Sequence, residues 1–322
     1  MNFTPIKPIV RIQIVTYNSE KDILTCLANV YTQKGDFNKE IFIIDNASTD
    51  ETVSLVQSHY KDVNILQNFI NNGYAGGHNI GLKSNGKYDY ILTLNPDIKL
   101  KGNYIQSLIE VLSSNPKLGS ASGLLLRSDE EIIDSQGVGL RKNRRPFDIG
   151  QDTLVSKENS KRMIFGPCGA AAMYRRSFIE DVMINLEFFD EDFFAYKEDV
   201  DICWRGQLFG WSSIFVPSAV AIHERGWKHN SREKVSRLVK IHSFKNRYLL
   251  IIKNDDFINI CYHIPWILVF EVMAFFYILI KEPYLIRAWI KLWKLTSSAL
   301  IKRKQIMSKR KVSPKEIRKW FK

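Results

Sequence analysis

Short apolar runs alternate with amphipathic stretches over the first 115 residues of the chain. Helices are expected after Ser19, which is placed to cap one, from Ser48, which has capping-box spacing to Glu51, and over Asn103–Ser113. Because the apolar runs are short and nearly continuous, they predict the strands of a mostly parallel sheet that helices cover on both faces, which is an α/β fold. The predicted strands are Ile9–Val15, Glu40–Ile44, Val63–Leu66 and Tyr88–Leu94.

Polar side chains follow three of the predicted strands, at the point where each strand ends. The three segments are Thr16-Tyr17-Asn18, Asp45-Asn46-Ala47-Ser48 and Asn95-Pro96-Asp97. Parallel strands end at the same edge of a sheet, and open α/β sheets bind ligands beyond the carboxyl ends of their strands. We therefore expect these segments to lie together at a binding site.

The second half of the chain has a less regular pattern. Arg141–Ser160 is polar and basic and predicts a mobile loop, whereas the small residues in Phe165–Tyr174 suit a close approach of the backbone to a ligand. Glu198–Leu208 is predicted to be a helix, Trp211–His223 a strand, and Arg232–Ile252 a basic amphipathic helix.

The most apolar stretch is Ile264–Ile280, which has Glu271 in its middle. Its length is at the lower limit for a membrane span. The residues that follow interleave tryptophan with lysine and arginine, which is typical of a helix that lies on a membrane surface. The alternative is a buried C-terminal helix followed by a solvated basic tail.

Charge is distributed unevenly along the chain. Residues 281–322 carry fourteen basic and two acidic residues, which accounts for the whole net charge of +12. A nucleic-acid-binding protein is therefore not expected, but contact of the tail with an anionic membrane surface is. The N-terminus lacks the apolar segment of a signal peptide. The four cysteines are Cys26, Cys168, Cys203 and Cys261, and no two of them have CxxC spacing. A structural zinc site or a disulfide framework is therefore not expected, and we expect the cysteines to be reduced, as in the cytosol.

Two acids at the strand ends are candidates for nucleotide and metal binding. Asp45 can accept hydrogen bonds from a base or ribose, although its segment is also a good turn and helix cap. Asp97 can reach a divalent ion between two phosphates, since Mg²⁺ needs only one or two protein carboxylates besides phosphate oxygens. An ordinary turn at Asn95-Pro96-Asp97 is the alternative.

A glycine-rich segment at residues 72–81 is a third candidate. Glycine-rich turns before a helix bring backbone N–H groups close to phosphate or sugar oxygens. The segment has neither the Lys-Ser/Thr of a P-loop nor the GxGxxG spacing of a dinucleotide site, so it matches neither of those motifs.

Acids also open the predicted helix at residue 198. The helix dipole favours the ionised form of Asp199, and an ionised aspartate in a cleft can take a proton from a sugar hydroxyl. The alternative is ordinary charge at a helix start, and Asp201 has the spacing for a salt bridge with Arg205. His223, at the end of the next strand, can contact a metal or a diphosphate, although lone histidines usually do neither.

In their order, these segments resemble glycosyltransferase family 2, which has the GT-A fold, and within it the rhamnosyltransferase-like branch of bacterial polysaccharide assembly. The resemblance covers about residues 9–250 and includes Gly169-Ala170-Ala171 and Cys203-Trp204-Arg205. It implies a Rossmann-like, mostly parallel sheet in a catalytic domain at 1–255, with a helical membrane-associating appendage at 256–322. Asn95 stands where the family's acid-x-acid motif has its first acid, so one carboxylate would do most of the metal anchoring.

The resemblance also implies roles for single residues. Asp199 would be the catalytic base, supported by Glu198, and Asp97 would hold Mg²⁺ or Mn²⁺ with His223 as a further ligand. The acceptor would contact Glu198, Trp204 and Arg247. The donor would be bound by Thr16, Tyr17, Asn18, Asp45, Asn46, Asn72, Gly76, Gly77 and Asn95.

These expectations describe an inverting, metal-dependent glycosyltransferase, cytoplasmic and peripheral on the inner face of the cell membrane. Its donor is expected to be dTDP-rhamnose, with a UDP- or GDP-hexose as alternatives, and its acceptor a hydroxyl of a lipid-linked saccharide or an oligosaccharide. A nucleotidyltransferase or a nucleotide-sugar-binding protein would need a basic triphosphate loop near the first strand, which the sequence lacks.

The prediction depends on Asp45, Asp97 and Asp199 lining one crevice at the edge of the sheet. The basic helix at 232–252 offers candidates for the diphosphate of a lipid-linked acceptor, or else a solvated face: Arg232, Lys240, Lys245 and Arg247.

Overall fold

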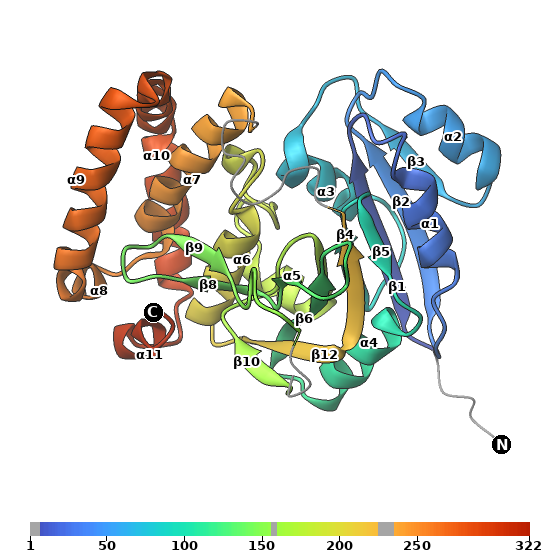
Figure 1. Cartoon of the computed structure of the whole chain (residues 1–322). Helices are drawn as coiled ribbons and strands as arrows, with labels where there is room; N and C mark the ends of the chain where they lie inside the picture. The colour runs from blue at the N-terminus through green and yellow to red at the C-terminus, as the bar shows by residue number, and fades with distance from the viewer. Residues whose placement is uncertain (1–6, 156–159, 225–234) are drawn as a thin grey trace.

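A ten-stranded sheet forms the centre of the computed structural model, which describes residues 7–155, 160–224 and 235–322 (Figure 1). The strand order is β10-β12-β6-β11-β4-β1-β2-β3, with β5 paired to β12 and β7 to β6, while β8 and β9 form a separate hairpin. The strands are β1 Ile9–Thr16, β2 Asn38–Asp45, β3 Asn64–Gln67, β4 Tyr90–Leu94, β5 Ile98–Leu100, β6 Leu118–Leu126, β7 Ile133–Ser135, β8 Val138–Leu140, β9 Pro146–Asp148, β10 Arg162–Ile164, β11 Ala171–Arg175 and β12 Ser212–His223.

The N-terminal half of the sheet is parallel. Strands β3, β2, β1 and β4 pair in parallel, and Thr16 lies opposite Asp45 in the register, so the polar segments after β1 and β2 leave the sheet side by side. Strands β6 and β12 form a second parallel pair, which the antiparallel strand β11 joins to β4. The predicted α/β fold with a mostly parallel central sheet is confirmed, as are its first four strands.

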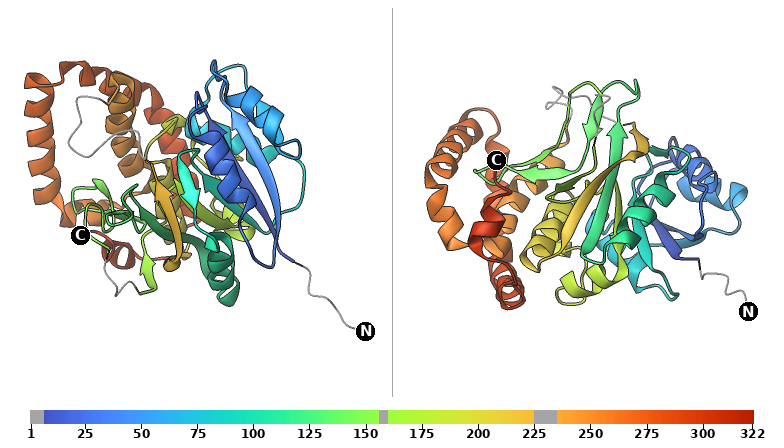
Figure 2. Two further views of the ribbon diagram at one scale, coloured as in Figure 1. Left: turned by 45° about the vertical axis from the view of Figure 1, so that its right-hand side comes forward. Right: turned by 90° about the horizontal axis from the view of Figure 1, so that it is seen from below.

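Helices flank the sheet in the views of Figures 1 and 2. Helix α3 packs on β1 and β2, and α4 packs on β6 and β12. The helices are α1 Ile23–Tyr31, α2 Thr52–His59, α3 Gly73–Lys83, α4 Tyr104–Ser114, α5 Arg176–Val182, η1 Glu191–Phe193, α6 Glu198–Leu208, α7 Arg237–Asn254, α8 Phe257–Tyr262, α9 Ile264–Ile280, η3 Pro283–Leu285, α10 Ile286–Ser308 and α11 Pro314–Arg318.

Helices α1 and α2 begin later than predicted, and neither has a side-chain cap. Ser19 meets α1 only through its backbone carbonyl, which accepts the first N–H groups of the helix. The predicted capping box between Ser48 and Glu51 is wrong, because the Ser48 hydroxyl donates at 2.5 Å to the carboxylate of Asp45 instead. The spacing of Ser48 and Glu51 could not reveal this outcome, because the competing acceptor is Asp45 at the end of β2.

Helices α7, α9 and α10 gather at the end of the molecule opposite to β1–β3 (Figures 1 and 2). Helix α10 packs along α7, and Leu292, Ala299 and Ile306 join the core that contains the sheet. Of α9, only Ile278 is buried. Within the described ranges, no single helix combines the length and the apolar composition needed to cross a membrane, whereas α9 and residues 283–308 meet both criteria only as a pair bent by 118°. A domain boundary after residue 255 stays a prediction.

Residues 141–155 do not form the mobile loop that their polar composition predicted. They contain β9 and the turn of the β8–β9 hairpin. The turn is anchored by Arg144, whose buried Nε donates to Asp255 at 2.6 Å and whose guanidinium lies over the ring of Phe321. The prediction is wrong because these partners lie more than 100 residues further along the chain. Residues 156–159, also part of the predicted loop, lie outside the described residues.

Candidate active site

A cavity of about 580 Å³ lies where the residues after β4 meet the start of α6 and the β8–β9 hairpin. Five of the residues predicted for the site line it: Asn95, Asp97, Glu198, Asp199 and His223. The other lining residues are Tyr74, Val138, Pro146, Phe147, Asp148, Cys168, Gly169, Ala170, Ala195, Tyr196, Lys197, Val200 and Ser243.

His223 joins two carboxylates on one side of this cavity. Its Nδ1 lies 2.8 Å from Asp134, and its Nε2 lies 3.4 Å from Oδ2 of Asp97. Burial acts to lower the pKa of His223, but the hydrogen bonds with Asp134 and Asp97 outweigh it and raise the pKa to about 9. At neutral pH the ring is therefore a cation that donates from both nitrogens, and it fixes the orientation of Asp97.

The other carboxylate oxygen of Asp97, Oδ1, is buried and accepts no hydrogen bond from the described residues. Among those residues, no group of three or more His, Cys, Asp or Glu side chains is arranged to hold a metal ion. A divalent ion would therefore take Oδ1 of Asp97 and complete its shell with ligand and water oxygens, which suits Mg²⁺ or Mn²⁺. His223 adds no lone pair to that shell while it is doubly protonated, and its role as a further metal ligand stays a prediction.

Glu198 and Asp199 present two different carboxyl groups to the cavity. Asp199 accepts backbone N–H groups from Gly169 at 3.0 Å and Val200 at 2.8 Å, while burial raises its pKa. Gly169 allows this contact, because a Cβ there would lie 3.1 Å from the Cβ of Asp199. Burial and the charge of Asp199 raise the pKa of Glu198 well above its usual range, and Oε2 of Glu198 has no partner among the described residues. In such a pair of carboxyl groups, one can keep its proton while the other is ionised and accepts a proton.

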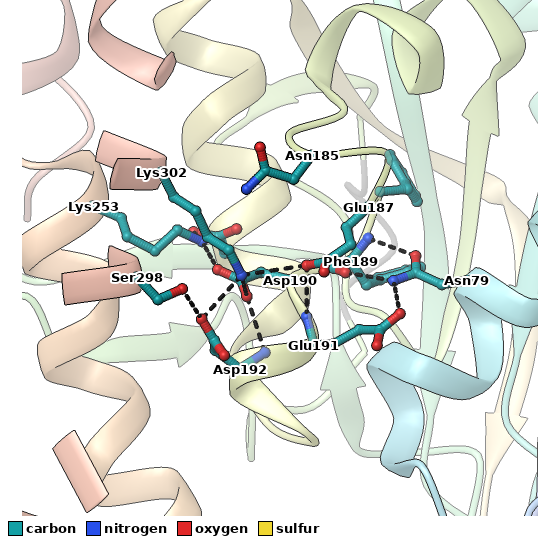
Figure 3. A network of polar contacts seen from close by, with 12 residues as sticks. Asn79, Asn185, Glu187, Phe189, Asp190, Glu191, Asp192, Lys253, Ser298 and Lys302 are labelled. Atoms are coloured by element: carbon teal, nitrogen blue, oxygen red, sulfur yellow. Dashed lines mark hydrogen bonds and ion pairs between the residues drawn. The ribbon is translucent and has the colours of Figure 1, made fainter. Parts of the chain in front are cut away.

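Buried ion pairs connect the helix that carries Asp199 to the C-terminal helices. Asp201 pairs with Arg205 at 3.0 Å, as predicted, and with Lys253 of α7 at 2.8 Å. Lys253 also contacts Asp190, which Lys302 of α10 contacts at 2.5 Å (Figure 3). Three segments far apart in the sequence therefore fix the position of α6.

The segment that leads into α6 has a strained backbone. Phe194, Tyr196 and Lys197 have positive φ values of 66°, 71° and 73°, which cost about 1–3 kcal/mol per residue for residues other than glycine. The buried Asn246 of α7 directs its amide nitrogen at the carbonyls of residues 193, 195 and 196, at distances from 2.7 to 3.0 Å. Asn246 therefore holds a wall of the cavity in an otherwise unfavourable shape.

Asp45, predicted to bind the base, is not among the residues that line this cavity. Its carboxylate accepts the Thr16 hydroxyl at 2.9 Å and the Ser48 N–H at 2.9 Å. These bonds are those of a structural turn at the end of β2. Of the three acids that we expected in one crevice, the structure brings Asp97 and Asp199 together and leaves Asp45 outside the lining.

The other residues after β1 and β2 also make local contacts. Asn46 is buried and donates to the carbonyl of Gly73 at 2.8 Å. Asn18 has a φ of 52° and accepts the N–H of Thr49, while Tyr17 is exposed. Their role in donor binding stays a prediction.

The glycine-rich segment does not form a turn before a helix, as we expected, because residues 73–83 are themselves helix α3, with Asn72 before its first turn. A Cβ on Gly77 would lie 2.8 Å from Cγ1 of Val15 in β1, and a Cβ on Gly76 would lie 2.8 Å from Cβ of Asn72. Gly77 therefore allows close packing of α3 on the strand. Donor contacts of Asn72, Gly76 and Gly77 stay a prediction.

The basic residues of α7 are engaged inside the protein. Arg247 pairs with Glu271 of α9 at 2.6 Å, and Lys240 pairs with Glu282 at 2.8 Å. Lys245 is buried and donates to the carbonyl of Asp192. None of the three lines the cavity. The alternative prediction, that they form a solvated helix face, is wrong as well, because their side chains are paired inside the protein. Arg232 lies outside the described residues.

Trp204, predicted to contact the acceptor, is fully buried. Its ring packs edge-on against Phe165 and Phe321 in the core. Trp204 follows Asp199 by five residues, so the two side chains lie on different faces of α6, and Trp204 does not line the cavity. We therefore do not propose it for acceptor binding.

Sequence reasoning missed several residues that the structure places at the site. Lys197 could have been identified from its position directly before Glu198 and Asp199. Ser243 lies in no sequence motif. Asp134 meets His223 across 89 residues of sequence, so only the fold reveals the pair.

Comparison with known proteins identifies two family models in this chain. The model of glycosyl transferase family 2 matches residues 12–183, more than half of the chain, and that of glycosyl transferase family group 2 matches residues 147–296. The chain is 27% identical over 236 residues to N-acetylglucosaminyl-diphospho-decaprenol L-rhamnosyltransferase of Mycobacterium tuberculosis, covering 66% of this chain and 74% of that protein. It is 29% identical over 277 residues to rhamnosyltransferase WbbL of Escherichia coli, covering 77% of this chain and 96% of that protein.

Solved structures show the same fold at low sequence identity. A mannosyltransferase from Pyrobaculum calidifontis, solved with GDP-Man and Mn²⁺, has a TM-score of 0.54 and 16% identity, with 98% of this chain and 84% of that chain covered. GalNAc-T7, solved with UDP, GalNAc and Mn²⁺, has a TM-score of 0.60 and 13% identity; 77% of this chain is covered but only about half, 49%, of that one. The fold is therefore GT-A.

Proposed function

Because the chain belongs to glycosyltransferase family 2, we propose that it is an inverting, metal-dependent transferase of a nucleotide-activated sugar. The observation that carries the proposal is the cavity shared by Asp97, Glu198 and Asp199. Two carboxylate oxygens there, Oδ1 of Asp97 and Oε2 of Glu198, are buried without a partner among the described residues. Unpartnered buried acceptors are costly and mark a place where a ligand or ion completes the bonding.

For the donor we propose dTDP-rhamnose, and for the acceptor a hydroxyl of a lipid-linked saccharide in cell-surface polysaccharide assembly. Support comes from the two relatives named as rhamnosyltransferases, one of which is named for a diphospho-decaprenol acceptor. A UDP- or GDP-hexose is the alternative donor within the same fold.

In the proposed reaction, the acceptor oxygen attacks the anomeric carbon from the face opposite to the nucleotide. Asp199 takes the proton of that hydroxyl as the new carbon–oxygen bond forms. The bond between the sugar and the diphosphate breaks, and its electron pair leaves with the diphosphate. One displacement without an enzyme-bound sugar inverts the anomeric configuration. The burial that raises the pKa of Asp199 makes it a better proton acceptor near neutral pH.

Glu198 is proposed to orient the acceptor through its unpartnered carboxyl oxygen. Its raised pKa favours the protonated form, which can donate a hydrogen bond beside the ionised Asp199 without adding a second charge. Asp97 would hold Mg²⁺ or Mn²⁺ on the donor diphosphate, and His223 would keep Asp97 in place. When bound, such an ion stabilises negative charge on the leaving diphosphate.

We also propose that the C-terminal helices place the enzyme on the inner face of the membrane. Many large apolar side chains of α9 and α10 are exposed, among them Trp266, Phe275, Phe276 and Trp293. An apolar surface of this extent is unusual for a protein surrounded by water and is typical of an interaction surface. Basic residues on α10 suit anionic lipid headgroups.

The test is transfer from a panel of nucleotide sugars by the wild-type chain and by Asp199→Asn. We expect the variant to lose about 10²–10⁴-fold in turnover, because base removal costs that much, while a thermal shift with dTDP and Mg²⁺ persists. Asp36→Asn is the control and should keep full activity, because it removes an exposed carboxylate whose ion-pair partner among the described residues is Lys7. Wild-type turnover in Asp199→Asn would reject the base, and absence of transfer from every donor would reject the function.

A further inference from the structure

Lys197 and Ser243 place two unused hydrogen-bond donors on the wall of the cavity. The Lys197 ammonium donates to the carbonyl of Ser243 at 2.7 Å and to its hydroxyl oxygen at 2.6 Å. An ammonium has three N–H groups, so one remains. The Ser243 hydroxyl accepts from Lys197, and its own proton meets no acceptor among the described residues.

The charge of Lys197 is not neutralised by an ion pair. No carboxylate of the described residues lies within salt-bridge distance of its ammonium, although Glu198 and Asp199 are close enough to favour its charged form. Burial, with smaller contributions from the charges of Arg145 and Arg247, lowers the pKa of Lys197 to about 8. A cation whose charge is opposed by burial and that has no ion pair favours an anionic ligand, which would stabilise its charged form.

The position of this pair relates the catalytic acids to the apolar helices. Lys197 directly precedes Glu198 and Asp199, and Ser243 lies on α7. One turn further along α7, Arg247 pairs with Glu271 of α9, the helix whose apolar side chains are exposed. A ligand that runs from Asp199 toward α9 would therefore pass the two donors.

We propose that Lys197 and Ser243 form a phosphate subsite for the acceptor, so that the acceptor is a sugar linked through a phosphate or diphosphate to a lipid. The proposal rests on the proposed function, because it takes the acceptor hydroxyl to lie at Asp199. The sugar would occupy the cavity, the phosphate would receive hydrogen bonds from both donors, and the lipid would follow α9. The donor diphosphate offers the same chemistry, and the experiment separates the two sources.

The first experiment compares two acceptors, undecyl diphosphoryl N-acetylglucosamine and undecyl N-acetylglucosaminide, which lacks the diphosphate. For Lys197→Met, we expect KM for the first acceptor to rise about 10- to 100-fold, the size of one charge-assisted hydrogen bond. KM for the donor and KM for the phosphate-free acceptor should stay unchanged, whereas kcat should change equally with both acceptors, because the charge of Lys197 lowers the pKa of Asp199. Ser243→Ala should show a smaller rise of the same kind.

Lys39→Met is the matched control. Lys39 also donates to two backbone carbonyls, at 3.0 and 2.7 Å, and burial lowers its pKa as well, but it lies on β2 outside the cavity lining. It should change neither KM. A rise in the KM for the donor in Lys197→Met would assign the subsite to the donor diphosphate, and an equal rise in KM for both acceptors would show a structural role. Either result overturns the proposal.

The second experiment uses inorganic pyrophosphate in EDTA and does not require the acceptor sugar to be known. With metal ions chelated, Asp97 repels phosphate, and the difference in calorimetry between wild type and Lys197→Met reports binding at Lys197, because the basic residues of 281–322 are the same in both. We expect wild type to bind pyrophosphate, Lys197→Met to bind it at least about tenfold more weakly, and the Lys39 control to match wild type. Absence of binding by wild type, or equal binding by Lys197→Met, refutes the subsite. Failure of the proposed function would appear separately, as no transfer by wild type.

Discussion

Lys302 is the lysine through which α10 pairs with the acidic segment before α6, beside a hydrogen bond from Ser298 to Asp192, so its replacement measures what the ion pairs contribute. The ammonium contacts Asp190 at 2.5 Å, Asp192 at 2.9 Å and Glu187 at 3.3 Å (Figure 3). Lys302→Met keeps most of the apolar stem and removes the charge. The three carboxylates then face one another, while Lys253 stays in contact with Asp190 and Ser298 still donates to Asp192.

The size of the effect follows from the burial of the four groups. Removing one partner of a buried ion pair typically costs about 3–5 kcal/mol. The Lys302 and Asp190 side chains are only 7% and 5% exposed, but Asp192 and Glu187 are 22% and 24% exposed and can be hydrated after the loss. Lys253 also stays in contact with Asp190. We therefore expect the free energy of unfolding to fall by about 2–3 kcal/mol, below the full range.

The pH dependence gives a second measure of the same contact. Burial opposes ionisation of both groups, but the ion pairs prevail: Lys253 and Lys302 lower the pKa of Asp190, and Asp190 and Asp192 raise the pKa of Lys302. A lowered carboxyl pKa contributes stability above about pH 4 that is lost as the pH falls through the folded pKa. A raised lysine pKa contributes stability below about pH 10 that is lost as the pH rises through the folded value. The difference in the free energy of unfolding between wild type and Lys302→Met should be largest between these two pH limits and should decrease below about pH 4.

Urea unfolding at pH 7 and at pH 3, followed by fluorescence, measures both effects. Lys304→Met is the control, because Lys304 is an exposed lysine on the same helix, and surface replacements usually stay within about 0.5 kcal/mol. The reasoning would be refuted if Lys302→Met lost no more free energy of unfolding than Lys304→Met, or if its loss were as large at pH 3 as at pH 7.

Two further predictions concern the cavity. Asp97→Asn should weaken dTDP binding in Mg²⁺ by about 10- to 100-fold, since an ion loses its charged ligand, and should not weaken binding in EDTA, where the carboxylate only repels the diphosphate; calorimetry with equal affinities in Mg²⁺ would contradict the metal role. Asn246→Ala should lower the free energy of unfolding by about 2–4 kcal/mol, because carbonyls of a strained segment lose their donor, and it should also reduce sugar transfer. Thermal unfolding measures the first effect and turnover the second. Unchanged turnover would contradict the prediction, because the segment would then keep its shape without Asn246.

The sequence alone determined the features that depend on neighbours along the chain. Continuous apolar runs require a covered parallel sheet, and the polar residues that end those runs place Asn95 and Asp97 at its edge. The spacing of Asp201 and Arg205 on one helix face predicted their salt bridge. Such inferences need only the periods of helices and strands.

Only the tertiary structure decided which side chains meet across long stretches of chain. It pairs His223 with Asp134, anchors the predicted loop through Arg144 and Asp255, and turns the basic residues of α7 and Lys302 of α10 inward to acids or carbonyls. Local composition cannot reveal these partners, because a buried charge is stable only where the fold supplies its counterpart. For the same reason, the sequence named Asp199 as a candidate base, but the fold placed Lys197 and Ser243 beside it.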